Sequence, residues 1–151
     1  MKKELMKQHT LDSYPILHNF LAQLYKLCDV YVTDDMLEYI KDDYINQYCR
    51  CSDKTCSTVY ICSDRIPVFE DGEQVYIEAY NSNKGLIVLH FYDNGDIEIE
   101  ALEYSEYPFK DEVKYVFNNK AYDCSQEKAK NIVDNYFSNI NKKELSTIIV
   151  D

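Results

Sequence analysis

The chain has 151 residues, of which 46% are hydrophobic and 28% are charged, and its formal net charge is −11. This length fits one folded domain over residues 1–151, and the hydrophobic content excludes a disordered acidic tail. The acidic balance disfavours direct binding to nucleic acid or to anionic membranes, because both attract Lys and Arg.

Two helices are predicted in the N-terminal third of the chain. The first spans about 14–28, where Ser13 can cap the helix and Pro15 is tolerated in the first turn. The second spans about 34–48, with Thr33 as its N-cap. The helical period places a set of polar residues on the outer face of this second helix, namely Asp35, Glu38, Tyr39, Asp42 and Asn46.

The middle of the chain is predicted to form a sheet. A short strand at 58–62 and an alternating strand at 75–80 precede an apolar strand at 86–92 and a returning strand at 97–101. Between the last two, the segment Asp93–Asp96 contains an Asn-Gly pair, which is typical of a type I′ hairpin turn. We therefore expect an antiparallel meander of three strands, with 58–62 beside it as a fourth.

The C-terminal part is predicted to contain a short strand, a helix and a β-prone tail. The short strand covers 113–117. A helix capped by Asp123 or Ser125 follows, and apolar residues recur on one of its faces as far as Ile140. The tail at 146–150 is β-prone, and it either adds an edge strand to the sheet or hangs free and pairs with a neighbouring molecule. The fold class is therefore α+β, with a meander of three to five strands packed against N-terminal and C-terminal helices.

Negative charge is concentrated in two windows. Residues 29–53 hold seven acids and two bases, and residues 93–112 hold eight acids and one base, which leaves twelve acids and thirteen bases elsewhere. Clustered acids speed association with a basic partner, and neighbouring tyrosines supply contact area. The predicted partner-binding residues are Asp35, Glu38, Tyr39, Asp42, Glu98, Glu100, Glu103, Tyr104, Glu106 and Tyr107.

The sequence leaves the arrangement of these two windows open. They strengthen the binding hypothesis if they join into one anionic face. If they lie on opposite sides of the molecule, the simpler interpretation is two solvated faces, which is the usual role of charged runs.

Four of the six cysteines fall close together, at Cys49, Cys51, Cys56 and Cys62. A zinc ion needs four such ligands in tetrahedral geometry, so zinc is a possible cofactor, and no other is expected. The spacing lacks a C-x2-C pair, and the alternative is a set of reduced cysteines that pack as small hydrophobic residues. A cytoplasmic protein would not form disulfides between them.

No catalytic motif is present, so we do not expect an enzyme. The sequence lacks a P-loop, a dinucleotide fingerprint, HExxH and GxSxG. His90 lies in the predicted central strand, where a satisfied sheet histidine is more common than a catalytic base. The N-terminus lacks the apolar region of a signal peptide, and no apolar run approaches the roughly 20 residues of a membrane helix. We therefore expect a cytoplasmic location and no membrane partner.

Two stretches carry a resemblance to small bacterial domains, CRCSDKTCSTVYI (Cys49–Ile61) and GLIVLHFYDNGDIEIEALEYSEYPF (Gly85–Phe109). In size, acidity and architecture the chain also resembles the immunity proteins of bacterial contact-dependent inhibition and polymorphic toxin systems. That resemblance implies a stoichiometric inhibitor that covers a basic, nuclease-type toxin with acidic and aromatic side chains. No motif carries individual residues across from the family.

Two other functions compete with the immunity hypothesis. One is a phage or mobile-element inhibitor that mimics the charge of nucleic acid. The other is a small zinc-binding structural domain. The sequence does not distinguish among the three, and it leaves the oligomeric state open.

Overall fold

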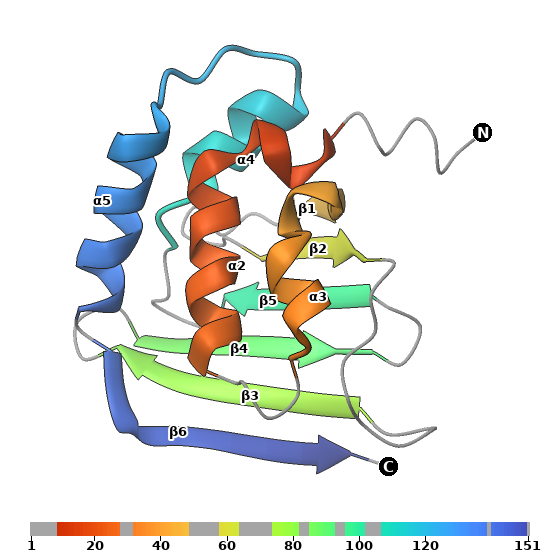
Figure 1. Cartoon of the computed structure of the whole chain (residues 1–151), viewed down its shortest axis with the longest axis vertical. Coiled ribbons are helices and arrows are strands. Elements are labelled where there is room, and N and C mark those ends of the chain that lie inside the picture. Colours follow the sequence, from red (N-terminus) through yellow and green to blue (C-terminus); the bar gives the residue numbers. More distant parts are fainter. Residues whose placement is uncertain are drawn as a thin grey trace.

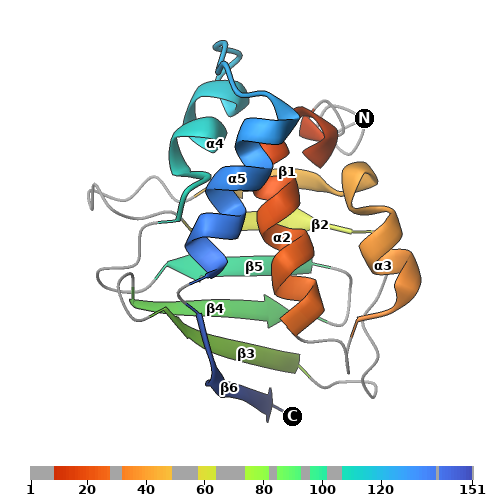
Figure 2. The same ribbon diagram turned by 60° about the vertical axis from the view of Figure 1, so that its left-hand side comes forward.

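A computed structural model describes residues 9–27, 32–48, 58–63, 74–81, 85–92, 96–101, 107–138 and 140–150. In this part of the chain the helices lie on one side of a six-stranded antiparallel sheet (Figures 1 and 2). The α+β class is therefore confirmed. The sheet has one strand more than the upper bound expected from the sequence.

The strand order of the sheet is β1-β2-β5-β4-β3-β6. The strands are β1 (Tyr44–Tyr48), β2 (Val59–Cys62), β3 (Gln74–Asn81), β4 (Gly85–Phe91), β5 (Asp96–Ala101) and β6 (Ile140–Val150). The predicted meander of β3, β4 and β5 is confirmed, and β2 pairs with β5 as expected. The β-prone tail does form an edge strand, which begins already at Ile140 and pairs with β3. The predicted turn at Asn94-Gly95 lies outside the described residues.

The helical layer contains α2 (Pro15–Leu27), α3 (Asp34–Glu38), α4 (Lys110–Phe117) and α5 (Gln126–Phe137), with two 3-10 turns, η2 (Leu11–Ser13) and η3 (Ile40–Asp42). Two predicted caps are confirmed. The backbone N–H of Met36 donates to Thr33 Oγ1 at 3.1 Å, and that of Lys128 donates to Ser125 Oγ at 3.1 Å. Each cap satisfies a backbone donor that the first helical turn leaves without a partner.

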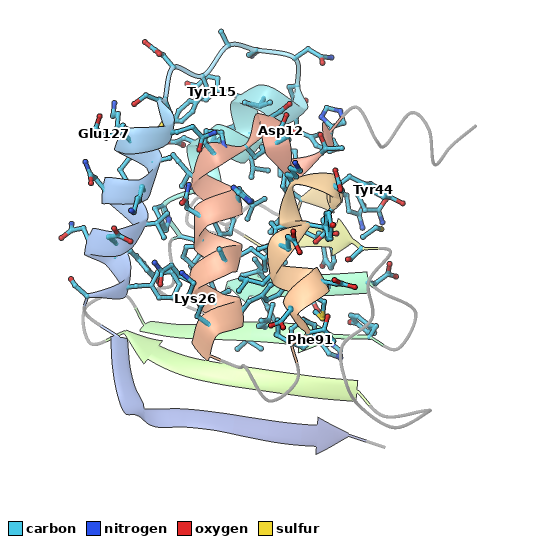
Figure 3. All side chains as sticks on the ribbon, in the orientation of Figure 1. Asp12, Lys26, Tyr44, Phe91, Tyr115 and Glu127 are labelled. Carbon is cyan, nitrogen blue, oxygen red and sulfur yellow. The ribbon has the colours of Figure 1, made fainter. Side chains whose placement is uncertain are left out.

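The core lies between the helices and the sheet, and Figure 3 shows the described side chains on the ribbon. The apolar stripe predicted for α2 is buried, including Leu17, Phe20 and Leu24. It packs in the same cluster as Ile97 and Ile99 of β5. Burying each such side chain contributes about 1.5–3 kcal/mol. Because side chains alternate along a strand, burial of these isoleucines turns the acids of β5 to the other face of the sheet.

The prediction of a helix over 34–48 is wrong for the residues after Glu38. The α-helix ends there, and 44–48 forms β1. The register of β1 against β2 shifts between Ile45 and Gln47, which marks a bulge. A bulge adds one residue to one strand of a pair, so the alternation of inward and outward side chains is interrupted at that point.

This bulge explains why the segment has a helical pattern. Ile45 pairs with Ile61, and Tyr48 pairs with Val59, and all four belong to or pack against the core. Inward residues three apart are typical of a helix, yet here they belong to a bulged strand. Tyrosine and isoleucine also favour strands, and pairing with β2 outweighs the local pattern.

The C-terminal predictions need two corrections. The segment 113–117, predicted as a strand, belongs to the helix α4. Its apparent alternation fails because Tyr115 is exposed, whereas Glu112 and Val113 are both buried. The last helix ends at Phe137 rather than Ile140, because Ile140 pairs with Asn81 and begins β6.

Candidate functional site

The first predicted surface is exposed even though its helix is shorter than expected. We call it the acidic α3 surface, and it consists of Asp34, Asp35, Glu38, Tyr39 and Asp42. Burial of Met36 and Ile40 in the core turns these residues outward. Tyr39 is 36% exposed, which is unusual for a large side chain in this structure. Acids in the first turn of α3 also complement the positive end of the helix dipole.

The second predicted surface lies on the face of the sheet opposite the helices. We call it the open sheet face, and its described members are Tyr60, Val88, His90, Tyr92, Glu98 and Glu100. The register places Glu98 of β5 between Tyr60 of β2 and His90 of β4. Val88 pairs with Glu100 in the same ladder. Two acids and several aromatic rings are therefore neighbours on three central strands.

Glu98 is the centre of a contact cluster on this face. Its Oε1 lies 3.6 Å from Nδ1 of His90 and accepts a hydrogen bond from the Tyr92 hydroxyl at 3.4 Å. The rings of His90 and Tyr92 are in contact, with centroids 3.8 Å apart. Burial lowers the pKa of His90, although the nearby Glu98 carboxylate acts in the opposite direction. The imidazole is therefore largely neutral at pH 7 and does not cancel the charge of Glu98.

Burial distinguishes the open sheet face from an ordinary solvated face. Val88 is only 4% exposed and His90 only 2%. The Glu98 side chain is 15% exposed. Burial, followed by the charge of Glu98, raises the pKa of Glu100. The two carboxylates are thus partly removed from water and repel each other.

The row of acids on β5 extends to Asp96. Its Oδ1 accepts a hydrogen bond from the Cys62 thiol at 3.4 Å. Among the side chains that the structure describes, no lysine or arginine forms an ion pair with Glu98 or Glu100. The open sheet face therefore holds two carboxylates among aromatic rings.

The two acidic surfaces are separated by the sheet. Met36 of α3 and Ile97 and Ile99 of β5 belong to the same core cluster, so α3 lies on the inner side of the sheet. Glu98 and Glu100 alternate with those isoleucines and face the other way. The same separation is visible in Figures 1 and 2, where α3 lies with the other helices. In the described part of the chain the two windows do not form one surface. This is the arrangement for which two solvated faces are the simpler interpretation, so the binding hypothesis depends on one of the surfaces alone.

Tyr107 was predicted as a partner-binding residue, and the structure contradicts this. Its side chain is 1% exposed and packs against Phe20 and Phe109, with ring centroids 5.3 Å and 5.4 Å away. Its hydroxyl donates to the backbone carbonyl of Glu100, so burial leaves no unsatisfied polar group. Three further predicted residues, Glu103, Tyr104 and Glu106, lie outside the described residues.

The predicted zinc cluster is mostly outside the described residues. This applies to Cys49, Cys51 and Cys56, whereas Cys62 is described and half-buried. Among the residues that the structure describes, no group of three or more His, Cys, Asp or Glu side chains is arranged to hold a metal. The zinc site stays a prediction.

Glu112 has a role that the sequence did not reveal. Its fully buried carboxylate accepts hydrogen bonds from the backbone N–H groups of Ile16 and Leu17, at 2.8 Å and 3.0 Å. These are free donors at the start of α2, so Glu112 performs the capping role predicted for Ser13, which lies in η2 instead. Burial raises the pKa of Glu112 to about 7, while the two N–H bonds oppose this.

A single signal hinted at this arrangement: α2 begins with a proline, and the helix needs acceptors for the N–H groups that follow it. The acceptor is 95 or more residues away in sequence, which local patterns do not reveal. One acid of the second window is therefore a structural cap rather than part of a surface.

Comparison of the chain with known protein families, characterised proteins and solved structures found no match. Among the described residues, none of the helices has the length and apolar character needed to cross a bilayer.

Proposed function

We propose that the protein is a stoichiometric binding protein that neutralises a basic partner, and that this partner is a nuclease-type toxin, as for a bacterial immunity protein. The observation that carries the proposal is the acidic α3 surface. Four acids and the exposed ring of Tyr39 lie together there, with Lys41 as the one base of this segment. Such a surface complements a protein that uses Lys and Arg to hold phosphates.

Binding alone is sufficient for this function. A nuclease is inhibited when its basic cleft is covered, and the inhibitor needs no catalytic group. Exposed acids raise the rate of encounter with a cationic surface, and this effect weakens as salt screens the charges. The proposal therefore predicts fast, salt-sensitive association.

The separation of the two acidic surfaces limits how a partner can bind. One compact partner domain covers one side of the sheet, so only one of the surfaces is its main contact. The other adds to the long-range negative field that attracts the partner.

The proposal is tested by growth protection. The protein is expressed together with each member of a panel of small basic nuclease toxin domains, and survival is measured. A protected pair is then purified, its stoichiometry is determined, and its affinity is measured at about 50 mM and about 500 mM salt. We expect a one-to-one complex whose affinity falls at high salt. Absence of protection across the panel, or an affinity that salt does not change, would contradict the proposal.

A competition experiment separates the immunity hypothesis from nucleic-acid mimicry. A charge mimic occupies the DNA-binding surface of its target and is displaced by excess duplex DNA. It also inhibits DNA-binding proteins that are not toxins. We expect protection to be restricted to a nuclease toxin, and inhibition of several unrelated DNA-binding proteins would favour mimicry.

A further inference from the structure

The two edges of the sheet differ in how they are closed. At one end of the strand order, the start of β1 is covered, because Tyr44 forms a backbone bridge with Thr10. The backbone N–H of Leu11 also donates to the carbonyl of Asp43, directly before β1. At the other end, β6 pairs with β3 on one side, and no described strand pairs with its other side. The outer edge of β6 therefore offers backbone donors and acceptors to a further strand.

The edge strand β6 lies away from most of the helical layer. In Figures 1 and 2, α2, α3 and α4 lie toward the β1 end of the sheet, and β6 is the outermost strand at the opposite end. A neighbouring molecule can reach this edge without displacing any of these three helices.

The first half of β6 carries features that prevent strand pairing. The register of β6 against β3 shifts between Glu78 and Tyr80, and residues 142–145 of β6 lie in this irregularity. The strand bends there, as Figure 1 shows. The same residues include all the charges of β6, which are Lys142, Lys143 and Glu144. Bulges and edge lysines are common means by which proteins avoid unwanted pairing at a sheet edge.

The second half of β6, residues 146–150, has neither feature, and we call it the terminal edge. It pairs regularly with β3, from Ser146 opposite Glu78 to Val150 opposite Gln74. Its sequence, Ser-Thr-Ile-Ile-Val, has no charge and no proline, and its last four residues are β-branched. Alternate residues of an antiparallel edge strand direct their N–H and C=O groups away from the sheet. The terminal edge is therefore a favourable template for one more strand.

A second copy of the same edge fits this template. Two identical antiparallel strands are related by a two-fold axis, so each edge complements the other. The register that pairs all five residues is centred on Ile148 and sets Thr147 opposite Ile149 of the second copy. No charged residue then lies opposite another, which favours contact between chains of net charge −11. β6 holds two bases and one acid, whereas β5 holds three acids and no base, so repulsion between copies is weaker at this edge.

We infer that two copies of this chain associate through their terminal edges, so that the two sheets join into one continuous antiparallel sheet. The two-fold axis is perpendicular to the sheet, which keeps the helical layers of both copies on the same side. The paired segments are short compared with a standard interface, so the dimer is weak and forms at micromolar or higher concentration. The inference does not depend on the proposed function. A dimer binds two toxin domains and keeps the one-to-one ratio, because α3 lies toward the other end of the sheet (Figure 2).

The oligomeric state of the full chain tests the inference. Sedimentation velocity is measured from about 5 µM to about 500 µM protein. We expect a monomer at the lower end and a rising share of dimer toward the upper end. Hydrogen exchange at the upper end locates the interface, with slower exchange expected at alternate residues of 146–150 and no change in α3. A chain that stays monomeric throughout, or slower exchange confined to α3 or β1, would overturn the inference.

Paired charge variants test the register. Thr147→Lys with Ile149→Lys sets like charges opposite each other across the two-fold axis and should weaken the dimer about tenfold. Thr147→Glu with Ile149→Glu should do the same. An equimolar mixture of the two variants sets opposite charges together and should recover association. Gln47→Lys adds a charge to β1 at the other edge and is the control, with association unchanged. If each variant associates as the wild type does, or the mixture shows no recovery, the inference is wrong.

The toxin assay distinguishes a second copy from another occupant of the edge. If the wild type is monomeric at every concentration and Thr147→Lys with Ile149→Lys abolishes protection, the terminal edge binds a strand of the toxin, and the inference is overturned. Protection retained by this variant, once it is shown to be monomeric where the wild type is dimeric, supports the inference, because the edge then serves association between copies.

Discussion

The acidic α3 surface and the open sheet face have similar compositions, but their acidic side chains differ in how deeply they are buried. Both combine several acids with tyrosine, and both were predicted from the same kind of charged window. The acids of α3 are exposed, whereas Glu98 and Glu100 are half-buried beside aromatic rings. A count of charges along the sequence therefore does not reveal how strongly each charge can act. Exposed carboxylates act at long range, and half-buried ones act on contact.

Glu112 extends the comparison to a fully buried carboxylate. It belongs to the same sequence window as Glu98 and Glu100, yet its carboxylate is enclosed in the protein. Its two oxygens serve the backbone at the start of α2. The three kinds of acid therefore differ in burial, from the exposed acids of α3, to the half-buried Glu98 and Glu100, to the fully buried helix cap Glu112.

The largest expected effect is on folding stability at Glu112. Replacement Glu112→Ala leaves the N–H groups of Ile16 and Leu17 buried without acceptors, so we expect the free energy of unfolding to fall by about 2–4 kcal/mol. Urea denaturation measures this. The control is Glu127→Ala, an exposed acid on the outside of α5 (Figure 3), with a change within about 0.5 kcal/mol. If Glu112→Ala lowers the free energy of unfolding no more than Glu127→Ala does, the buried carboxylate of Glu112 does not stabilise the fold.

The pH dependence of stability gives a second test of the buried acid. The pKa of Glu112 is about 7 in the folded state, above its ordinary 4.5, so the folded state keeps its proton to higher pH. Its contribution to stability is therefore complete below about pH 4.5 and is lost as the pH rises through about 7. Melting temperatures of the wild type and Glu112→Gln are compared across this range.

We expect the wild type to lose stability relative to Glu112→Gln as the pH rises. The opposite trend would mean that the two backbone N–H bonds outweigh burial and hold the pKa low.

A smaller effect is expected at the cap of α3. Thr33→Ala removes the acceptor of the Met36 N–H and should cost about 1 kcal/mol. Hydrogen exchange should quicken more in α3 than in β5, because loss of the cap frays α3 locally, whereas a central strand exchanges through global unfolding. Ser125→Ala removes the equivalent acceptor at α5 and is the matched control, with the larger increase expected in α5. A larger increase in β5 than in α3 for the Thr33 variant would contradict this.

The smallest expected effect is a gain in stability on the open sheet face. Glu100→Gln relieves repulsion from Glu98 and removes a partly desolvated charge, and it should raise the free energy of unfolding by about 0.5 kcal/mol near pH 8. Glu38→Gln on the acidic α3 surface should change it by less than about 0.3 kcal/mol. Thermal unfolding distinguishes the two, and a loss of stability in Glu100→Gln would show that this carboxylate stabilises the fold and contradict the prediction.

Strict local patterns made much of the fold predictable. The alternation of Ile97 and Ile99, the one-face stripe of α2 and the caps at Thr33 and Ser125 all depend on neighbours a few residues away. The elements that were wrong depend on tertiary contacts. The bulge in β1 gives a strand the spacing of a helix. It forms only when β1 pairs with β2, so the sequence of β1 alone does not reveal it.

The candidate site was predictable in part. Exposure of Asp35, Glu38 and Asp42 followed from the helical period, which α3 and η3 broadly keep. Burial of Tyr107 did not, since it depends on Phe20 of a distant helix. The opposite placement of the two surfaces depends on which side of the sheet α3 packs, and no local pattern encodes that choice.

The proposed function is tested most directly by a kinetic measurement on a protected toxin complex. Association and dissociation rates are measured for the wild type and for Asp35→Asn with Asp42→Asn, each at about 50 mM and about 500 mM salt. We expect the variant to slow association about threefold to tenfold at low salt, and high salt to reduce this difference. Equal association rates of the wild type and the variant at low salt would contradict the proposed role of the acidic α3 surface.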